Sequence, residues 1–390
     1  MHENLPGGTF RTIRTLARFA GPGWIAMIAD FDAASILTAA QTGISFGYRF
    51  VWFLILLIFP LYFIQEACGR IGLATGMGLG TAIRMRFSRK VSVGSSFPMA
   101  LTDIITYVAE YSGIAIGLSL IGIPPYIGLP FFFVIYLLLV YRRKFRAVEV
   151  TLISITMMLI VAMVAALAGR GLVSSPALYV SSSPTFLFML GANAGAVVMP
   201  FMLFYQSSAT THKPGTLLRM LRMETMFGAI ATEVLMVITE MLFTGSGIFD
   251  GNTLSSSVMY SLHSVAGEYS GILFGIGIIS AAFVSLVVIS LASSWGIVES
   301  AGIPPDNSFR IYVVESLPAL LIAMLIPYHL SLILYAMVFL VFALIVPGIM
   351  AGIISSDRRL MGNLSSSMKS RIAYWSSMIV TISFGFMAIL

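Results

Sequence analysis

The chain has 390 residues, of which 58% are hydrophobic and only 10% are Asp, Glu, Lys or Arg. A typical soluble domain carries roughly 25% charged residues, so the excess of apolar side chains is expected to face lipid. This composition excludes most soluble enzymes, nucleic-acid-binding proteins and disulfide scaffolds. The single cysteine, Cys68, cannot form an internal disulfide and matches no metal-site spacing.

Apolar runs close to the roughly 20 residues that cross a bilayer recur along the whole chain. We therefore predict an all-α membrane protein with about eleven transmembrane helices, forming a single transporter domain over residues 1–390. Residues 1–19 lack a small-residue cleavage site and are interpreted as a tail and not a signal peptide. The predicted spans lie near residues 20–40, 48–68, 97–121, 126–141, 147–168, 184–208, 225–246, 270–294, 311–328, 331–354 and 372–390.

The basic residues predict the orientation of these spans. If the amino end is cytoplasmic, all of the 22 Lys and Arg residues except Arg49 and Arg170 lie on the inside. This distribution follows the positive-inside rule and predicts a multi-pass protein of the prokaryotic plasma membrane, with its carboxyl end outside. The net charge of +6 therefore reflects topology and gives no reason to expect a nucleic-acid partner.

The first and sixth spans carry polar residues near their middles. Asp30 and Asp32 lie in the first span, and Asn193, Gly195 and Pro200 lie in the sixth. A carboxylate at this depth costs about 2.5–3.5 kcal/mol on insertion scales, and no Lys or Arg lies within a span to pair with it. Polar interruptions at matching places in two halves of a transporter indicate broken helices around a midplane binding site. We predict one repeat over about 20–168, an inverted one over about 184–355, and an extra helix at 372–390.

Other acidic residues occur in pairs inside predicted spans. Asp103 and Glu110 are seven residues apart, as are Glu233 and Glu240, so each pair shares one helix face. Helix–helix hydrogen bonding and a path for cations or protons both remain open as explanations.

Several segments resemble NRAMP divalent-metal transporters. The resemblance covers nearly the whole chain and implies a LeuT-like fold, a 5+5 inverted repeat with broken helices 1 and 6. The matching residues are Gly21-Pro-Gly23, Asp32, Gln41-Thr-Gly-Ile-Ser-Phe-Gly-Tyr48, Gln65, Arg70-Ile-Gly72, Ala196-Val-Val-Met199-Pro200 and Ser356-Asp-Arg-Arg-Leu-Met-Gly362.

Departures from the family pattern point to one branch of it. The family's Asp-Pro-Gly-Asn is Asp32-Ala33-Ala34-Ser35 here, its histidine after Met-Pro is Phe201, and one acid of its Asp-x-x-Glu is Tyr107. The additional Asp30, together with Gln65-Glu66 and Pro200-Phe-x-x-Phe-Tyr-Gln206, is most similar to the NRAMP-related magnesium transporter branch. That resemblance implies transport of Mg²⁺ and Mn²⁺ by alternating access without proton coupling.

The resemblance and the ligand preferences of these ions give the predicted metal site. Mg²⁺ prefers oxygen ligands and retains several waters, whereas a thioether favours softer transition metals such as Mn²⁺ or Fe²⁺. The predicted metal ligands are Asp30, Asp32, Ser35, Ala196, Met199 and Gln206. The ion is the substrate, so no cofactor is expected, and the only other expected partner is the lipid bilayer, with no obligate protein partner.

Two other functions remain open. One is a proton-coupled Mn²⁺ or Fe²⁺ importer, and the other is a carrier of an organic solute, such as an amino acid, on the same fold. A channel should show a continuous polar pore face, which the last two spans lack. An enzyme is not expected, because no nucleophile–base pair occurs in the sequence.

Overall fold

The computed structural model describes residues 21–141, 160–161, 163–164, 167–168, 171–213, 215–245, 270–325 and 330–390. Throughout these ranges the regular elements are helices, which agrees with the predicted all-α fold. Most of the predicted fifth span, 147–168, lies outside the described residues.

The longer helices coincide with the other predicted spans. They are α2 (Pro22–Asp30), α3 (Ala33–Phe46), α4 (Val51–Thr75), α6 (Arg89–Leu120), α7 (Pro125–Tyr141), α9 (Pro184–Val197), α10 (Pro200–Thr211), α11 (Leu218–Phe243), α13 (Ser270–Ala301), α14 (Ser308–Leu325), α15 (Leu330–Ala343), α16 (Ile345–Ser356) and α18 (Met368–Met387). Shorter helices are α5 (Leu79–Arg86) and α17 (Arg358–Met361), with 3-10 turns at Pro305–Asn307 and Gly362–Leu364.

Six helical segments in the described ranges are long and apolar enough to cross a membrane, and seven if α2 and α3 form one bent span. The count of eleven spans stays a prediction. Two helices are much longer than predicted, because α6 and α13 each extend over 32 residues. The tenth predicted span is two helices, α15 and α16, which meet at Leu344.

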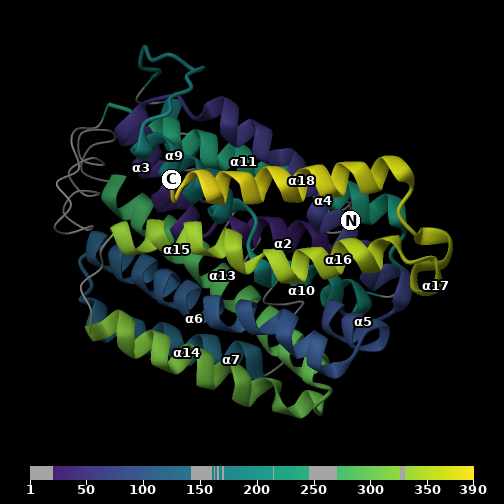
Figure 1. Cartoon of the computed structure of the whole chain (residues 1–390). Coiled ribbons are helices and arrows are strands. Elements are labelled where there is room, and N and C mark those ends of the chain that lie inside the picture. The colour runs from purple at the N-terminus through teal and green to yellow at the C-terminus, as the bar shows by residue number, and fades with distance from the viewer. Residues whose placement is uncertain are drawn as a thin grey trace, which may run out of the picture.

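Close helix contacts place the broken helices inside the bundle. In the view of Figure 1, α15, α16 and α18 lie in front of α2 and α10. Glycines allow α11 to approach both halves of the first span, since a Cβ at Gly228 would meet Met27 and one at Gly43 would meet the backbone of Glu240. On the neighbouring side, a Cβ at Gly113 of α6 would meet the side chain of Ala33 at the start of α3. These contacts pack α11 and α6 directly against the break in the first span.

The two ends of the bundle are held by polar contacts. At one end, Arg70 of α4 pairs with Glu66 and donates to the carbonyl oxygen of Leu364 at 2.7 Å, which fixes the segment before α18. At the other end, the backbone N–H of Tyr48 donates to Ser175 Oγ at 3.1 Å. Figure 1 places α5 and α17 at one end of the bundle and the teal segment around Ser175 at the other.

Candidate metal-binding site

The first span is interrupted at two residues, Phe31 and Asp32. Helix α2 ends at Asp30, α3 begins at Ala33, and the two helices are bent by 48°. Asp32 is the N-cap of α3, and its carboxylate accepts a hydrogen bond from the backbone N–H of Ser35 at 2.7 Å. An aspartate in this position satisfies one of the free N–H groups at a helix start, so Asp32 and Ser35 favour a new helix there.

The sixth predicted span is interrupted at Val198 and Met199. Both residues have non-helical backbone angles, and Pro200 is the first residue of α10. Proline is well accommodated at a first helical position, where its missing N–H leaves no hydrogen bond unmade. The sequence therefore encodes this second break through Pro200.

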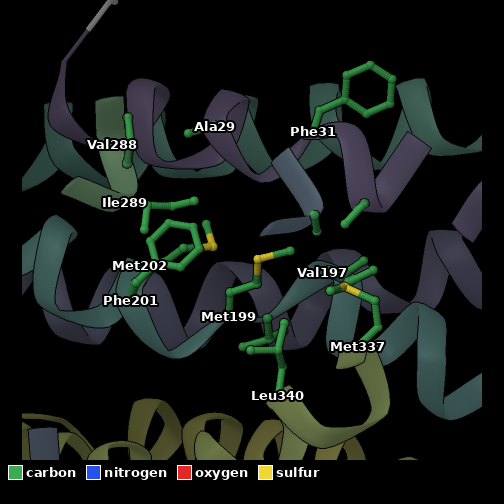
Figure 2. Packing of buried hydrophobic residues seen from close by; sticks show 14 of the residues in the cluster. Ala29, Phe31, Val197, Met199, Phe201, Met202, Val288, Ile289, Met337 and Leu340 are labelled. Carbon is green, nitrogen blue, oxygen red and sulfur yellow. The ribbon is translucent and has the colours of Figure 1, made fainter. Parts of the chain in front are cut away.

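A hydrogen bond joins the two breaks. The hydroxyl of Ser35 donates to the carbonyl oxygen of Ala196 at 2.9 Å, across 161 residues of sequence. Figure 2 shows the sulfur-bearing side chain of Met199 extending toward the α2–α3 segment, whereas the Phe31 ring points away from it. The structure thus brings together Asp32, Ser35, Ala196 and Met199, four of the six residues predicted as ligands.

Ligand atoms remain available at this junction. Asp32 is fully buried, and its second carboxylate oxygen has no hydrogen-bond partner among the described residues. The carbonyl oxygen of Ala196 keeps one lone pair beside its bond to Ser35, and the thioether of Met199 is fully buried. Asp30, at the end of α2, is also fully buried, with both oxygens unpartnered in the described part of the chain.

Gln206 lies apart from this junction. It is seven residues beyond Met199 in α10, roughly 10 Å along the helix, and its amide donates to Thr225 of α11 at 3.4 Å. A Cβ at Gly69 would also meet this amide, so Gln206 packs between α4 and α11. Asn193, one turn before the second break, donates to Thr42 Oγ1 and to the Met189 carbonyl oxygen.

Glu110 of α6 reaches the first break, although the sequence alone did not identify it as part of the site. Its carboxylate accepts from the backbone N–H of Ala33 at 3.2 Å and interacts electrostatically with Asp32. Asp103, seven residues before Glu110 in α6, interacts electrostatically with Glu315 of α14. Tyr107, which replaces a family acid, donates to Ser290 of α13 at 3.0 Å. Its hydrogen bond to the start of α3 distinguishes Glu110 from the other buried acids described above. The spacing of residues in the sequence does not predict that α6 packs against α3 at this point.

The site differs from a resident metal centre. No group of three or more His, Cys, Asp or Glu side chains in the described ranges is arranged to hold a metal ion. The junction of the two breaks instead offers one carboxylate, one carbonyl oxygen and one thioether. Within the described ranges, the ion pairs found engage Glu66, Glu224 and Asp357, and none of these pairs involves an acid at the breaks.

Known proteins share both sequence and fold with this chain. Residues 23–390 match the natural resistance-associated macrophage protein-like family, Nramp. The chain is 26% identical over 303 residues to the divalent metal cation transporter MntH of Verminephrobacter eiseniae, covering 74% of this chain and 68% of that protein. It is 36% identical over 118 residues to MntH of Bacillus subtilis, covering 30% of this chain and 28% of that protein.

Solved structures share the overall fold. The manganese transporter of Eremococcus coleocola superposes with a TM-score of 0.77 at 18% identity, covering 99% of this chain and 88% of that one. Mhp1, a nucleobase-cation-symport-1 family transporter, superposes with a TM-score of 0.58 at 15% identity, covering 95% and 92%. These similarities confirm the predicted LeuT-like fold with broken helices. Since the family match spans nearly the whole sequence, the chain belongs to the Nramp family of membrane transporters and is not an enzyme.

Proposed function

We propose that this protein carries Mg²⁺ and Mn²⁺ across the prokaryotic plasma membrane by alternating access. Its relatives in Verminephrobacter eiseniae and Bacillus subtilis are named as divalent metal cation transporters, which supports a divalent metal as the substrate class. The whole chain acts as one transporter domain, with repeats at about 20–168 and 184–355 and an extra helix at 372–390.

The observation that carries this proposal is the junction between the two breaks. Ser35 of α3 donates a hydrogen bond to the carbonyl oxygen of Ala196 and so holds the two breaks together. The carboxylate oxygen of Asp32 that has no partner among the described residues belongs to the first break, and Met199 belongs to the second. We propose Asp32, Ala196 and Met199 as direct ligands, with Ser35 holding the carbonyl in place. Asp30 supplies a second carboxylate beside them, and Gln206 is left out because its amide contacts Thr225.

The choice of ion follows from the chemistry of this ligand set. Oxygen ligands suit Mg²⁺, which keeps part of its hydration shell in protein sites. The thioether of Met199 adds affinity for Mn²⁺ and none for Mg²⁺. Both ions are therefore proposed substrates, in keeping with the resemblance to the magnesium branch.

Transport is proposed to proceed without proton coupling. Phe201 and Tyr107 stand where the family carries titratable groups, and Tyr107 is engaged with Ser290. One observation favours the proton-coupled alternative, because Glu110 lies against Asp32 and could receive a proton when metal binds. The two mechanisms differ in whether metal uptake changes the pH inside a vesicle.

The test is uptake of Mg²⁺, Mn²⁺ and Ca²⁺ by liposomes that contain the purified protein and a pH-sensitive dye. Asp32→Asn is the informative variant, because asparagine caps a helix as well as aspartate does but lacks the charge. We expect uptake of Mg²⁺ and Mn²⁺ by the wild type without a pH change, and no uptake by Asp32→Asn. Acidification during uptake would support the coupled importer, and no metal uptake at all would favour an organic-solute carrier.

A further inference from the structure

Glu233 lies beside the first break, near Asp30, and has no place in the ligand set proposed above. Glu233 of α11 is fully buried, and neither of its carboxyl oxygens has a hydrogen-bond partner among the described residues. The same holds for Asp30 at the end of α2. Buried polar groups are nearly always hydrogen-bonded in folded proteins, so four free oxygens on two neighbouring helices need an explanation.

Packing between α2 and α11 brings these two side chains together. Thr232, the residue before Glu233, donates from its hydroxyl to the carbonyl oxygen of Met27 at 2.5 Å. Gly228 lies against the Met27 side chain, so no larger group separates the two helices one turn earlier. The Asp30 carboxyl interacts electrostatically with both Asp32 and Glu233.

No basic side chain of the described residues balances these acids. The ion pairs of the described ranges involve Glu66, Glu224 and Asp357, which lie elsewhere. Uncompensated buried carboxylates are costly, and a cation that enters between them offsets that cost. Among the transported ions, the one that depends most on oxygen ligands is Mg²⁺, which also retains several waters in protein sites.

We propose that Asp30 and Glu233 form an oxygen subsite beside Asp32 that binds the hydration shell of the incoming cation, and that Glu233 determines the preference for Mg²⁺. This inference rests on the proposed metal transport and adds the residue that sets its selectivity. Mn²⁺ depends less on the subsite, because Met199 supplies it with a ligand that Mg²⁺ does not use.

Glu240 provides a matched control on the same helix. It lies seven residues after Glu233 on the same face of α11 and is also fully buried. One of its carboxyl oxygens already accepts from the backbone N–H of Phe50 at 3.0 Å, and the carbonyl oxygen of a glutamine can accept that bond as well. Glu240→Gln therefore removes an equivalent acid at a distance from the break.

The experiment compares Glu233→Gln, Glu240→Gln and Asp32→Asn in liposomes, measuring the KM for Mg²⁺ and for Mn²⁺. Groups that act through a metal's outer shell typically change affinity by about 10–100-fold. We expect Glu233→Gln to raise the KM for Mg²⁺ about tenfold and that for Mn²⁺ by less than about threefold, whereas Glu240→Gln matches the wild type. Asp30→Asn should give the same change in selectivity as Glu233→Gln.

A second measurement separates the subsite from transport itself. Mg²⁺ that binds the folded protein raises its Tm in detergent, and the shift reports binding even if uptake is slow. The inference is overturned if Glu233→Gln keeps the wild-type Tm shift and KM ratio while Asp32→Asn loses both. If Asp32→Asn behaves as the wild type, the proposed metal site fails instead. A wild type with no Mg²⁺-dependent shift in Tm overturns the subsite as well.

Discussion

Asp32 combines two tasks in one side chain. One carboxylate oxygen accepts the backbone N–H of Ser35 and starts α3, while the other is buried without a partner in the described part of the chain. The first oxygen fixes the position of the second, since the cap holds the side chain in one conformation. If Asp32 binds an ion as proposed, a side chain held in place in this way loses little conformational freedom on binding.

Met199 is expected to distinguish the two proposed ions. Met199→Ala removes the thioether but no charge and no hydrogen bond, so Mg²⁺ uptake should remain close to that of the wild type. Mn²⁺ should bind about tenfold more weakly, which corresponds to about 1.4 kcal/mol. Competition between the two ions in the uptake assay measures this change directly. Equal loss of both ions would show that the thioether is needed for folding and not for selectivity.

The residues of the junction could be predicted from the sequence more fully than their neighbours. Asp32 lies at a polar interruption of an apolar run, a local signal that the sequence carries by itself, whereas Ser35, Ala196 and Met199 were predicted from the resemblance to the family motif. Gln206 lies in the same helix as Pro200 but about two turns away, so its neighbours depend on how α4 and α11 pack. Glu110 and Glu233 reach the break only through contacts between distant segments, which one sequence does not reveal.

Asp357, which lies between α16 and α17, is expected to make stability depend on pH. The backbone N–H of Arg359 and the guanidinium of Arg86 lower the pKa of Asp357 below its usual value. Its contribution is therefore complete above the unfolded-state pKa of about 3.9 and is lost as the pH falls through the lower folded-state value. At pH 7, Asp357→Asn should lower the free energy of unfolding by at most about 1 kcal/mol, and the Tm should fall accordingly. The difference from the wild type should begin to shrink below about pH 4 and should vanish only once the pH is below the folded-state pKa, and a difference that stays constant with pH would contradict this explanation.

At the scale of helices, the site depends on close approaches that only glycine allows. A Cβ at Gly72, in the last turn of α4, would overlap the carbonyl oxygen of Ser207 in α10. Gly43 of α3 makes the same kind of contact with the backbone of Glu240, and Gly228 of α11 lies against the Met27 side chain of α2, so α11 packs closely on both halves of the first span. In a membrane protein such close packing is a main source of helix association, since lipid tails compete for apolar contacts.

Gly72→Ala is expected to destabilise the protein. The added methyl group meets backbone that cannot move without shifting α10, and such overpacking typically costs about 1–3 kcal/mol. Gly94→Ala in α6 is the matched control, because a Cβ there meets nothing within 4 Å. Alanine is the better helix former, so this control should be neutral or slightly stabilising. Thermal unfolding in detergent checks both, and equal Tm values for the two variants would contradict the packing argument.

The predicted helices agreed with the structure where apolar runs were long, and differed where helices were short or extended into polar sequence. Helix α5 has two arginines in eight residues and no apolar run, so hydropathy gave no reason to predict it. The long α6 begins at Arg89, eight residues before the predicted span, because its first turns carry serine and basic residues. Helices α15 and α16 meet at Leu344, shortly before Pro347. Proline near a helix start is typical of a helix boundary, but the continuous apolar run gave no reason to divide this span.

At the scale of the whole molecule, the distribution of Lys and Arg predicts which end faces the cytoplasm. The sole cysteine, Cys68, is buried, so the wild type should not react with a membrane-impermeant maleimide. Leu178→Cys, at an exposed position in the segment near Ser175, should be labelled in intact cells. Lys90→Cys, at the start of α6, should be labelled only after permeabilisation. The reverse pattern would invert the predicted orientation.

A divalent cation is proposed to bind between the two breaks. The most direct measurement is the anomalous scattering of Mn²⁺ in crystals of the wild-type protein grown or soaked with the ion. We expect one strong peak bonded to the free oxygen of Asp32, the carbonyl oxygen of Ala196 and the thioether of Met199, and no such peak in Asp32→Asn. A peak at Asp103 and Glu315, or a peak between the breaks that persists in Asp32→Asn, would contradict the account.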